Sequence, residues 1–396
     1  MNNIFSLLEK YIHSNKFHAL EWIIQHKENK YTGCIGSYNL EKDKLINNSI
    51  YRIWSMTKPI VCFAAMQLIE KNFLSLDDTI DKYLPNFKNL KKLKSLTSKL
   101  DDTIKIDRTP TVRQLLQHTA GFTYNSSNNF LAEAYEEKKL FHSSSRSLEE
   151  EIDNISGLPL LYEPGLEWHY SISIDILARI LEVVTKDKLL NILKENIFYP
   201  LEMNETNFFI SEDKNKNLVE TFEYNSVKSK LTDLTLASRK LILYGYPANN
   251  ENYCRGGHGL FSTAADYIKF ATMLINGKDK NAKPLVNMET LQSMRRNSLD
   301  RNLLPIEITS TNTIKDENYE NDLDGYGWGL GFRVLMNNTP QNKFGVMGEF
   351  GWSGYAATYF LVDPINDLSA VLMMQILDAE KNIKKDFYNN IFKNIK

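Results

Sequence analysis

One stretch of the sequence constrains the fold more than any other, namely residues 54–69. Its first seven residues read WSMTKPI, and the apolar run VCFAAMQLI follows at once. A long run of this kind, entered through a serine, is typical of a helix that is buried on nearly all sides. We expect the helix to begin at Ser55, because Pro59 then lies in the first turn, where the N–H that proline lacks would have no partner anyway. The rest of the chain must supply a core around this helix.

Ser55 and Lys58 are three residues apart, so a helix places their side chains on the same face. A serine hydroxyl becomes a good nucleophile only when a base takes its proton, and burial favours the neutral amine that lets a lysine act as that base. The start of a helix adds N–H groups that can bind an oxyanion. The spacing alone is common, and a serine at a helix start is most often a cap. The catalytic interpretation therefore depends on the rest of the sequence.

The composition is that of an ordinary globular protein of one large domain or two smaller ones, with 396 residues, 42% hydrophobic and 24% charged. A net charge of −2 argues against nucleic acid or an anionic membrane surface as a partner. No apolar window approaches about 20 residues, so we expect no membrane span. The first ten residues lack the features of a signal peptide. We therefore expect a cytoplasmic protein, or a periplasmic one if a leader has been removed.

Three cysteines, Cys34, Cys62 and Cys254, are widely spaced and form no C-x-x-C motif. We expect free thiols and a reducing compartment. His118, near the end of a predicted short helix, has no carboxylate or cysteine at the spacing of a metal ligand. It is interpreted as a structural hydrogen-bonding group rather than as a catalyst or a ligand.

Periodicity and turn residues predict the elements of both chain ends. The expected N-terminal elements are a helix over 4–14, strands over 19–26, 31–40 and 50–53, and the Ser55 helix. The expected C-terminal elements are strands over 327–335, 343–348, 355–362 and 369–377, and a helix over 384–395. This order predicts one sheet built from both ends of the chain. The predicted sheet domain therefore comprises residues 1–75 and 251–396.

The middle of the chain, residues 76–250, is predicted to form a mainly helical domain. The helices expected in and beside it are a short one after residue 74 and others over 111–121, 147–155, 175–185 and 266–275. A lysine-rich run over 88–105 is interpreted as a solvated loop. The glycines at 256 and 257 indicate a close approach of the backbone to another part of the protein.

A Pro-Gly turn in the stretch YEPGLEWHYSIS, residues 162–173, delivers Tyr170 just ahead of a predicted helix. A tyrosine held close to Lys58 could serve as a general base or as a proton shuttle. By itself, Tyr170 is only an aromatic residue at a turn.

Three motifs together resemble, in order and rough spacing, the active-site motifs of serine β-lactamases and penicillin-binding proteins. They are Ser55-Met56-Thr57-Lys58, Tyr170-Ser171-Ile172 and Trp352-Ser353-Gly354. The flanking blocks TVRQLLQHTAGF, YEPGLEWHYS, GGHGLFSTAADYIKFATML and YGWGLGF are similar to those of class C β-lactamase-like serine hydrolases. The resemblance covers nearly the whole chain. It implies an α+β fold of the β-lactamase/transpeptidase type, in which an antiparallel sheet flanked by helices is joined to a mainly helical domain.

The resemblance also implies an acyl-enzyme mechanism that uses no metal or cofactor. Ser55 would be the nucleophile, and Lys58 and Tyr170 would share the work of general base and proton shuttle; which of them takes the first proton stays open. The backbone N–H groups of Ser55 and Tyr355 would form the oxyanion hole.

Two departures from the pattern weaken a penicillin-hydrolysing interpretation. Trp352 stands where those enzymes usually carry a cation that binds a carboxylate, and Ile172 stands where they carry an asparagine. Both changes resemble the carboxylesterase branch of the family. In that branch the matching substrate-binding positions would be Trp352, Ser353, Gly354, Tyr124 and Asp175.

We therefore expect a carboxylesterase that acts on small uncharged esters. The alternatives are a β-lactamase or D-amino-acid peptidase, which would take an amide substrate, and a catalytically inactive binding member of the family. The natural substrate and the oligomeric state stay open.

Overall fold

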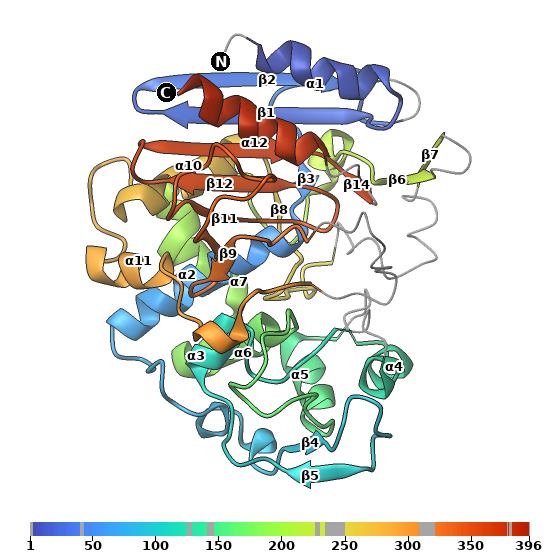
Figure 1. Ribbon diagram of the computed structural model, residues 1–396, viewed down its shortest axis with the longest axis vertical. Coiled ribbons are helices and arrows are strands. Elements are labelled where there is room, and N and C mark those ends of the chain that lie inside the picture. The colour runs from blue at the N-terminus through green and yellow to red at the C-terminus, as the bar shows by residue number, and fades with distance from the viewer. Residues whose placement is uncertain are drawn as a thin grey trace.

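The structure is a computed structural model that describes residues 3–39, 43–124, 129–140, 146–225, 230–233, 250–308, 321–377, 379 and 382–395 (Figure 1). Its main sheet has seven antiparallel strands in the order β2-β1-β13-β12-β11-β10-β9. The strands are β1 (Ala19–His26), β2 (Asn29–Gly36), β9 (Tyr326–Trp328), β10 (Arg333–Leu335), β11 (Phe350–Ser353), β12 (Tyr359–Asp363) and β13 (Leu368–Met373). The prediction of one sheet built from both chain ends is confirmed.

Both faces of this sheet are covered by helices, with α1 (Ile4–His13) and α12 (Asn382–Asn394) on one face and α10 (Ala264–Asn276) on the other (Figure 1). Alternate residues of β13 pack toward the two layers, as the period of two in a strand requires. Leu368, Ala370 and Leu372 pack in the cluster that contains α1 and α12, and Val371 and Met373 pack with α10 and α2. This double burial explains why all six residues of β13 are buried.

Helix α2 (Thr57–Glu70) crosses the centre of the molecule, and twelve consecutive residues from Thr57 to Leu68 are buried. The prediction of a helix buried nearly all round is confirmed. The prediction that it begins at Ser55 is wrong, because residues 54–56 form a separate turn of 3₁₀ helix. Trp54 has a left-handed φ of 49°, which turns the chain sharply, and the Met56 N–H then donates to the Ile53 carbonyl at 3.0 Å, three residues back.

The strands predicted in the C-terminal third need correction. Residues 327–335 form the hairpin β9–β10 rather than one strand, because Gly331 has a left-handed φ of 104°. Residues 343–348 form no strand, and β11 begins only at Phe350. The strand predicted from Tyr355 begins at Tyr359, after a turn closed by a 2.7 Å hydrogen bond from the Gly354 N–H to the Thr358 carbonyl. The last prediction, 369–377, covers β13 and β14 (Ile376–Leu377), and β14 pairs with β6 (Phe222–Asn225).

The middle of the chain supplies most of the remaining helices. They are α3 (Val112–Gln117), α4 (Phe130–Glu137), α5 (Leu148–Ser156), α6 (Ser173–Thr185), α7 (Leu189–Leu193) and α8 (Tyr199–Leu201), with α11 (Met288–Met294) later in the chain. The predictions behind α3, α5, α6 and α10 are confirmed, whereas α4, α7, α8 and α11 were not predicted. Thr111 and Ser147 begin α3 and α5 with capping boxes. α3 ends at His118, whose φ of 58° is left-handed, and not at the predicted Gly121.

Shorter segments also differ from prediction. The lysine-rich run over 88–105 contains the hairpin β4 (Lys91–Leu93) and β5 (Thr103–Lys105), because Leu93 is buried and its N–H donates to the Leu160 carbonyl at 2.8 Å. The short helix expected after residue 74 consists of two 3₁₀ turns over 80–82 and 85–87. The strand expected over 50–53 is β3 (Tyr51–Arg52), which pairs with β8 (Phe261–Ser262), and β7 (Lys230–Asp233) completes the small sheet with β6 and β14.

The strand predicted over 31–40 is β2, which starts at Asn29 and ends at Gly36; residues 40–42 lie outside the described part of the chain. All three cysteines are free thiols. In the residues that the structure describes, no helix is both long and apolar enough to cross a membrane. The domain boundaries at 75 and 250 stay a prediction.

Candidate active site

The amine of Lys58 connects the start of α2 to the loop that contains Gly257, 199 residues further along the chain. Its Nζ donates hydrogen bonds to Ser55 Oγ at 3.2 Å and to the Gly257 carbonyl at 2.7 Å. Only 1% of Lys58 is exposed, whereas Ser55 is half-buried. The Nζ also lies 4.7 Å from the ring centroid of Tyr170 and 5.3 Å from that of Tyr124. The predicted pair of Ser55 and Lys58 is thus brought together, with Ser55 on the side that solvent can reach.

Tyr170, which lies just before α6, joins the second motif to the third. Its hydroxyl accepts a 3.0 Å hydrogen bond from Nε1 of Trp352, and the two ring centroids are 5.2 Å apart. Only 3% of Trp352 is exposed, and its ring packs edge-on against Trp328 at 4.6 Å. The indole that replaces the usual cation therefore contacts Tyr170 directly.

The end of β11 packs against the residues that immediately precede Ser55. A Cβ added to Gly354 would lie 2.6 Å from the Ile53 carbonyl oxygen and 3.2 Å from Cβ of Trp54, so only glycine allows this approach. Ser353 is half-buried, and Tyr355 is 59% exposed, with its ring edge-on to Trp54 at 5.6 Å. Residues 353–355 therefore border the nucleophile, and the role of the Tyr355 N–H in the oxyanion hole stays a prediction.

Asp175, on α6, binds the same loop as Lys58. Its Oδ1 accepts a 2.9 Å hydrogen bond from the Gly257 N–H, and its side chain is fully buried. Burial raises the pKa of Asp175 to about 6, although the charge of Lys58 and the Gly257 N–H oppose this shift. The structure thus places Asp175 against the Gly257 backbone, which also binds Lys58. The contact of Asp175 with a substrate stays a prediction.

Tyr124 completes the aromatic surroundings of the amine. Its ring centroid is 5.8 Å from that of Tyr170, and burial, with smaller contributions from Tyr170 and Asp175, holds the pKa of its phenol well above the usual value. Tyr124 is therefore a neutral hydroxyl at physiological pH, and it can donate a hydrogen bond but not act as an anionic base.

Three aromatic residues that the sequence did not assign to the site pack around Tyr170. His118, Trp168 and Trp328 have ring centroids 4.7, 6.4 and 6.3 Å from that of Tyr170. The Ser171 N–H donates to His118 Nδ1 at 3.3 Å, and burial holds the pKa of His118 well below its usual range. His118 thus makes the hydrogen bond that its interpretation as a structural group predicted, although its position against Tyr170 was not foreseen.

A sequence signal for these aromatic residues did exist. Trp168 and His118 lie in the blocks YEPGLEWHYS and TVRQLLQHTAGF, and Trp328 lies in YGWGLGF. The Trp328 indole donates to the Leu116 carbonyl at 3.0 Å, which ties β9 to α3. These blocks therefore share a location, the surroundings of Tyr170. Across the described ranges, no group of three or more His, Cys, Asp or Glu side chains could hold a metal ion.

The sheet with helices on both faces, the buried α2 and the three converging motifs are the arrangement of the β-lactamase/transpeptidase fold, which is the fold the resemblance implied. The family model described as Beta-lactamase matches residues 11–392. The chain therefore belongs to the beta-lactamase family, whose members include serine hydrolases that act as esterases, acyltransferases and peptidases.

Three similar proteins illustrate this range. Lovastatin esterase of Penicillium rubens is 25% identical over 92% of this chain and 90% of its own length. A putative D-alanyl-D-alanine carboxypeptidase of Escherichia coli is 26% identical over 88% of this chain and 75% of its own. The solved structure of EstCE1, a hydrolase with promiscuous acyltransferase activity, has a TM-score of 0.77 and 24% identity and covers 99% of this chain and 98% of its own.

Proposed function

We propose that this protein is a serine hydrolase that forms an acyl-enzyme and acts on small uncharged carboxylic esters. The observation that carries the proposal is the hydrogen bond from the Trp352 indole to the Tyr170 hydroxyl. The third motif thus offers a neutral donor to the catalytic tyrosine, and a cation at position 352 would instead favour a substrate carboxylate. The similarity to a protein named lovastatin esterase supports an ester as substrate.

In the proposed reaction, Ser55 Oγ attacks the ester carbonyl carbon while its proton passes to Lys58, 3.2 Å away, or to Tyr170. A new bond joins Oγ to the carbonyl carbon, and the N–H groups of Ser55 and Tyr355 bind the oxyanion. Collapse of this intermediate breaks the bond to the alcohol, which leaves with the transferred proton. Water then attacks the acyl-enzyme by the same route and releases the acid.

Trp352 supports the part that Tyr170 plays in this transfer. A hydrogen bond donated to the tyrosine oxygen is stronger when that oxygen carries negative charge, as in a phenolate. The indole therefore stabilises the state in which Tyr170 has given up its proton. Packing of His118, Trp168 and Trp328 fixes the ring, so the oxygen stays within reach of Trp352.

The test compares the hydrolysis of p-nitrophenyl butyrate and of nitrocefin by one preparation in one buffer, with Ser55→Ala as the blank. We expect a Ser55-dependent rate that is clearly larger for the ester. Dominant turnover of nitrocefin would overturn the proposal and would mean that another residue supplies the missing cation.

A second candidate is a β-lactamase or D-amino-acid peptidase, favoured by the similarity to a protein named putative D-alanyl-D-alanine carboxypeptidase. Nitrocefin turnover that disappears in Ser55→Ala would support it. A catalytically inactive binding protein is the third possibility. Failure of a fluorophosphonate probe to label Ser55 would support that one, whereas the contact between Ser55 and Lys58 at 3.2 Å argues against it.

A further inference from the structure

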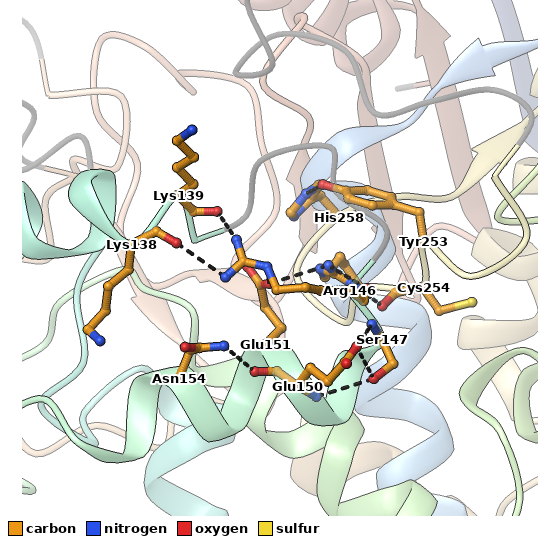
Figure 2. Close-up of polar contacts among 11 residues, drawn as sticks. Lys138, Lys139, Arg146, Ser147, Glu150, Glu151, Asn154, Tyr253, Cys254 and His258 are labelled. Carbon is orange, nitrogen blue, oxygen red and sulfur yellow. Dashed lines mark hydrogen bonds and ion pairs between the residues drawn. The ribbon is translucent and has the colours of Figure 1, made fainter.

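A buried ion pair lies two residues from Gly257 in the sequence, between Arg255 and Glu151. Glu151, on α5, and Arg255 both have fully buried side chains, and their closest charged atoms are 3.5 Å apart. The same oxygen of Glu151 lies 3.2 Å from Nε of Arg146 (Figure 2). Burying such charges has a large desolvation cost, so an ion pair of this kind is weak evidence for a stabilising role. The contacts of this ion pair indicate a role other than stability.

The guanidinium of Arg255 holds together the loop from which it comes. It donates to the carbonyl of Cys254 at 3.0 Å and to that of Arg146 at 3.1 Å, and it lies 4.5 Å from the ring centroid of Tyr253. The Tyr253 hydroxyl is 2.8 Å from Nε2 of His258, and Figure 2 shows this pair beside the ion cluster. The guanidinium therefore lies over the ring of Tyr253, whose hydroxyl contacts His258 at the other end of the segment 253–258.

The two glycines inside this segment carry the contact with Lys58. The Gly257 carbonyl accepts from Lys58 at 2.7 Å, and its N–H donates to Asp175 at 2.9 Å. A Cβ at Gly256 would lie 2.2 Å from the Ile174 carbonyl oxygen, so the loop is pressed against α6. Because Gly257 is two residues from Arg255, we expect a displacement of the Arg255 guanidinium to move the Gly257 carbonyl that binds the Lys58 amine. A shift of about 1 Å in a catalytic group can cost roughly 100-fold in rate.

The charges around Asp175 also couple Arg255 to the site. The groups that act on the Asp175 carboxyl are Lys58 from α2, Arg255 from the loop, Glu151 from α5, and the neighbouring phenol of Tyr124. The positive charges of Lys58 and Arg255 lower the pKa of Asp175, and the charge of Glu151 raises it. Loss of Arg255 would therefore leave Asp175 protonated to a higher pH.

We propose that the ion pair of Glu151 and Arg255 is a positioning device for the catalytic amine of Lys58, acting through the backbone of residues 255–257. The proposal rests on the function proposed above, since that function makes Lys58 the catalytic amine. Arg255 and Glu151 are positioning residues: they hold the loop, and the loop holds Lys58.

The test uses two variants of Arg255 and matched variants of Arg333, a buried arginine whose guanidinium also lies over a tyrosine ring, at 4.6 Å. Arg255→Lys keeps the charge but loses the fork of donors, and Arg255→Met loses both. We expect kcat for p-nitrophenyl butyrate to fall roughly 10-fold in the first and roughly 100-fold in the second, with KM changed less than about threefold. Arg333→Lys and Arg333→Met should leave kcat per folded molecule within about twofold.

Two further readouts separate positioning from a loss of folded protein. The acid limb of the kcat/KM profile should move to higher pH in Arg255→Met and stay in place in Arg255→Lys, because only the first removes the charge that acts on Asp175. Glu151→Gln should lower kcat, whereas Glu349→Gln, its counterpart beside Arg333, should not. Equal losses of kcat in the Arg255 and Arg333 variants, or a kcat of Arg255→Met equal to that of the wild type, would overturn the proposal.

Labelling of Ser55 by a fluorophosphonate keeps this test separate from the proposed function, because it needs no knowledge of the substrate. If the wild type labels but hydrolyses neither ester nor nitrocefin, the proposed function fails, and the labelling rates of the variants still decide the role of Arg255. We expect those rates to fall in the same order as kcat. A wild type that does not label would overturn both, since Lys58 would then not activate Ser55.

Discussion

Two buried arginines in this molecule have similar surroundings but connect different structural elements. Arg255 lies 4.5 Å from the ring centroid of Tyr253, and Arg333 lies 4.6 Å from that of Tyr326. Each belongs to a cluster with one glutamate whose side chain is fully buried, Glu151 for the first and Glu349 for the second. From composition and burial alone, the two clusters would be given the same role.

The difference lies in the elements that each cluster connects. Arg333 is on β10, and its guanidinium donates to the Tyr359 hydroxyl of β12 at 2.9 Å. The Tyr326 hydroxyl of β9 donates to Glu349, just before β11, at 2.8 Å, and the Tyr388 hydroxyl of α12 donates to the same oxygen at 3.4 Å, so this cluster connects the sheet to the helix that covers it. Arg255 instead joins α5 to the loop that holds Lys58. A buried charge cluster is therefore interpreted from the segments that it ties together.

The largest effect should come from the group that the Arg255 cluster is proposed to serve. We expect Lys58→Ala and Ser55→Ala each to lower kcat for ester hydrolysis by roughly 10⁴-fold or more, as when a member of a catalytic unit is removed. Because the two groups act as a unit, the double variant should be little slower than either single one. The measurement is kcat for all three variants, and additive losses would contradict the assignment and remove the basis of the comparison.

A smaller effect is expected at Trp352, which acts on Tyr170 from the sheet rather than from the loop. Trp352→Phe removes the indole N–H and should lower kcat roughly 10- to 100-fold, because a hydrogen bond to a charged group contributes about 1.5–3 kcal/mol. Steady-state kinetics of Trp352→His, which keeps a ring N–H, provide the control. Equal kcat for Trp352→Phe and the wild type would show that the bond has no part in catalysis.

The same position tests substrate charge. Trp352→Lys is expected to shift the preference toward anionic substrates, since it restores a cation that can bind a carboxylate. The measurement is the ratio of kcat/KM for an ester with a carboxylate on its acyl group to that for p-nitrophenyl butyrate. An unchanged ratio would show that residue 352 does not face the substrate.

A change of a few-fold is expected at Asp175, with a distinct dependence on pH. The raised pKa, about 6 against an ordinary 3.8, means that the folded protein keeps the proton between about pH 4 and 6 while the unfolded chain loses it. Stability from this group therefore falls as pH rises through that window. Loss of activity should follow the protonation of Asp175 as pH falls below 6.

Asp175→Asn keeps an acceptor for the Gly257 N–H and removes the titration. It should flatten both the acid limb of kcat/KM and the decline of the thermal midpoint between pH 4 and 6, at a cost of roughly three- to tenfold in kcat. An acid limb that persists unchanged in Asp175→Asn would assign it to another group.

The sequence could predict the contact between Ser55 and Lys58 because its signals are local. The apolar run after Ser55 requires a buried helix, and the three-residue spacing then places Lys58 beside Ser55. The hairpin at 327–335 was missed because its turn depends on the left-handed φ of Gly331 and on Gly329, where a Cβ would lie 2.0 Å from the Met294 carbonyl oxygen. Nothing in the alternation of the strand itself shows that contact.

The parts of the site that could not be predicted are those made by the backbone and by distant charges. The carbonyl that holds Lys58 belongs to Gly257, 199 residues further along the chain, and a carbonyl has no signal in a sequence. The adjacent glycines indicated a close approach, but not the partner. Glu151 follows a capping serine by four residues and looks like an exposed residue of the first turn of a helix, so only the tertiary fold shows that it is buried with Arg255.

The smallest effect on catalysis is expected at Glu21, another buried carboxylate, held by uncharged donors rather than by a guanidinium. On β1, it accepts the Asn48 N–H at 2.8 Å and a hydrogen bond from Tyr51, and burial raises its pKa to about 7. The folded protein therefore binds a proton that the unfolded chain releases between about pH 4.5 and 7, and stability falls as pH rises through that range. Glu21→Gln should remove this decline and raise the free energy of unfolding at pH 8 by roughly 3 kcal/mol, with kcat unchanged. Urea unfolding at pH 5 and pH 8 measures the free energy of unfolding. A parallel loss of kcat would show that the loop entering β3 is coupled to the active site and that buried carboxylates outside the site affect catalysis.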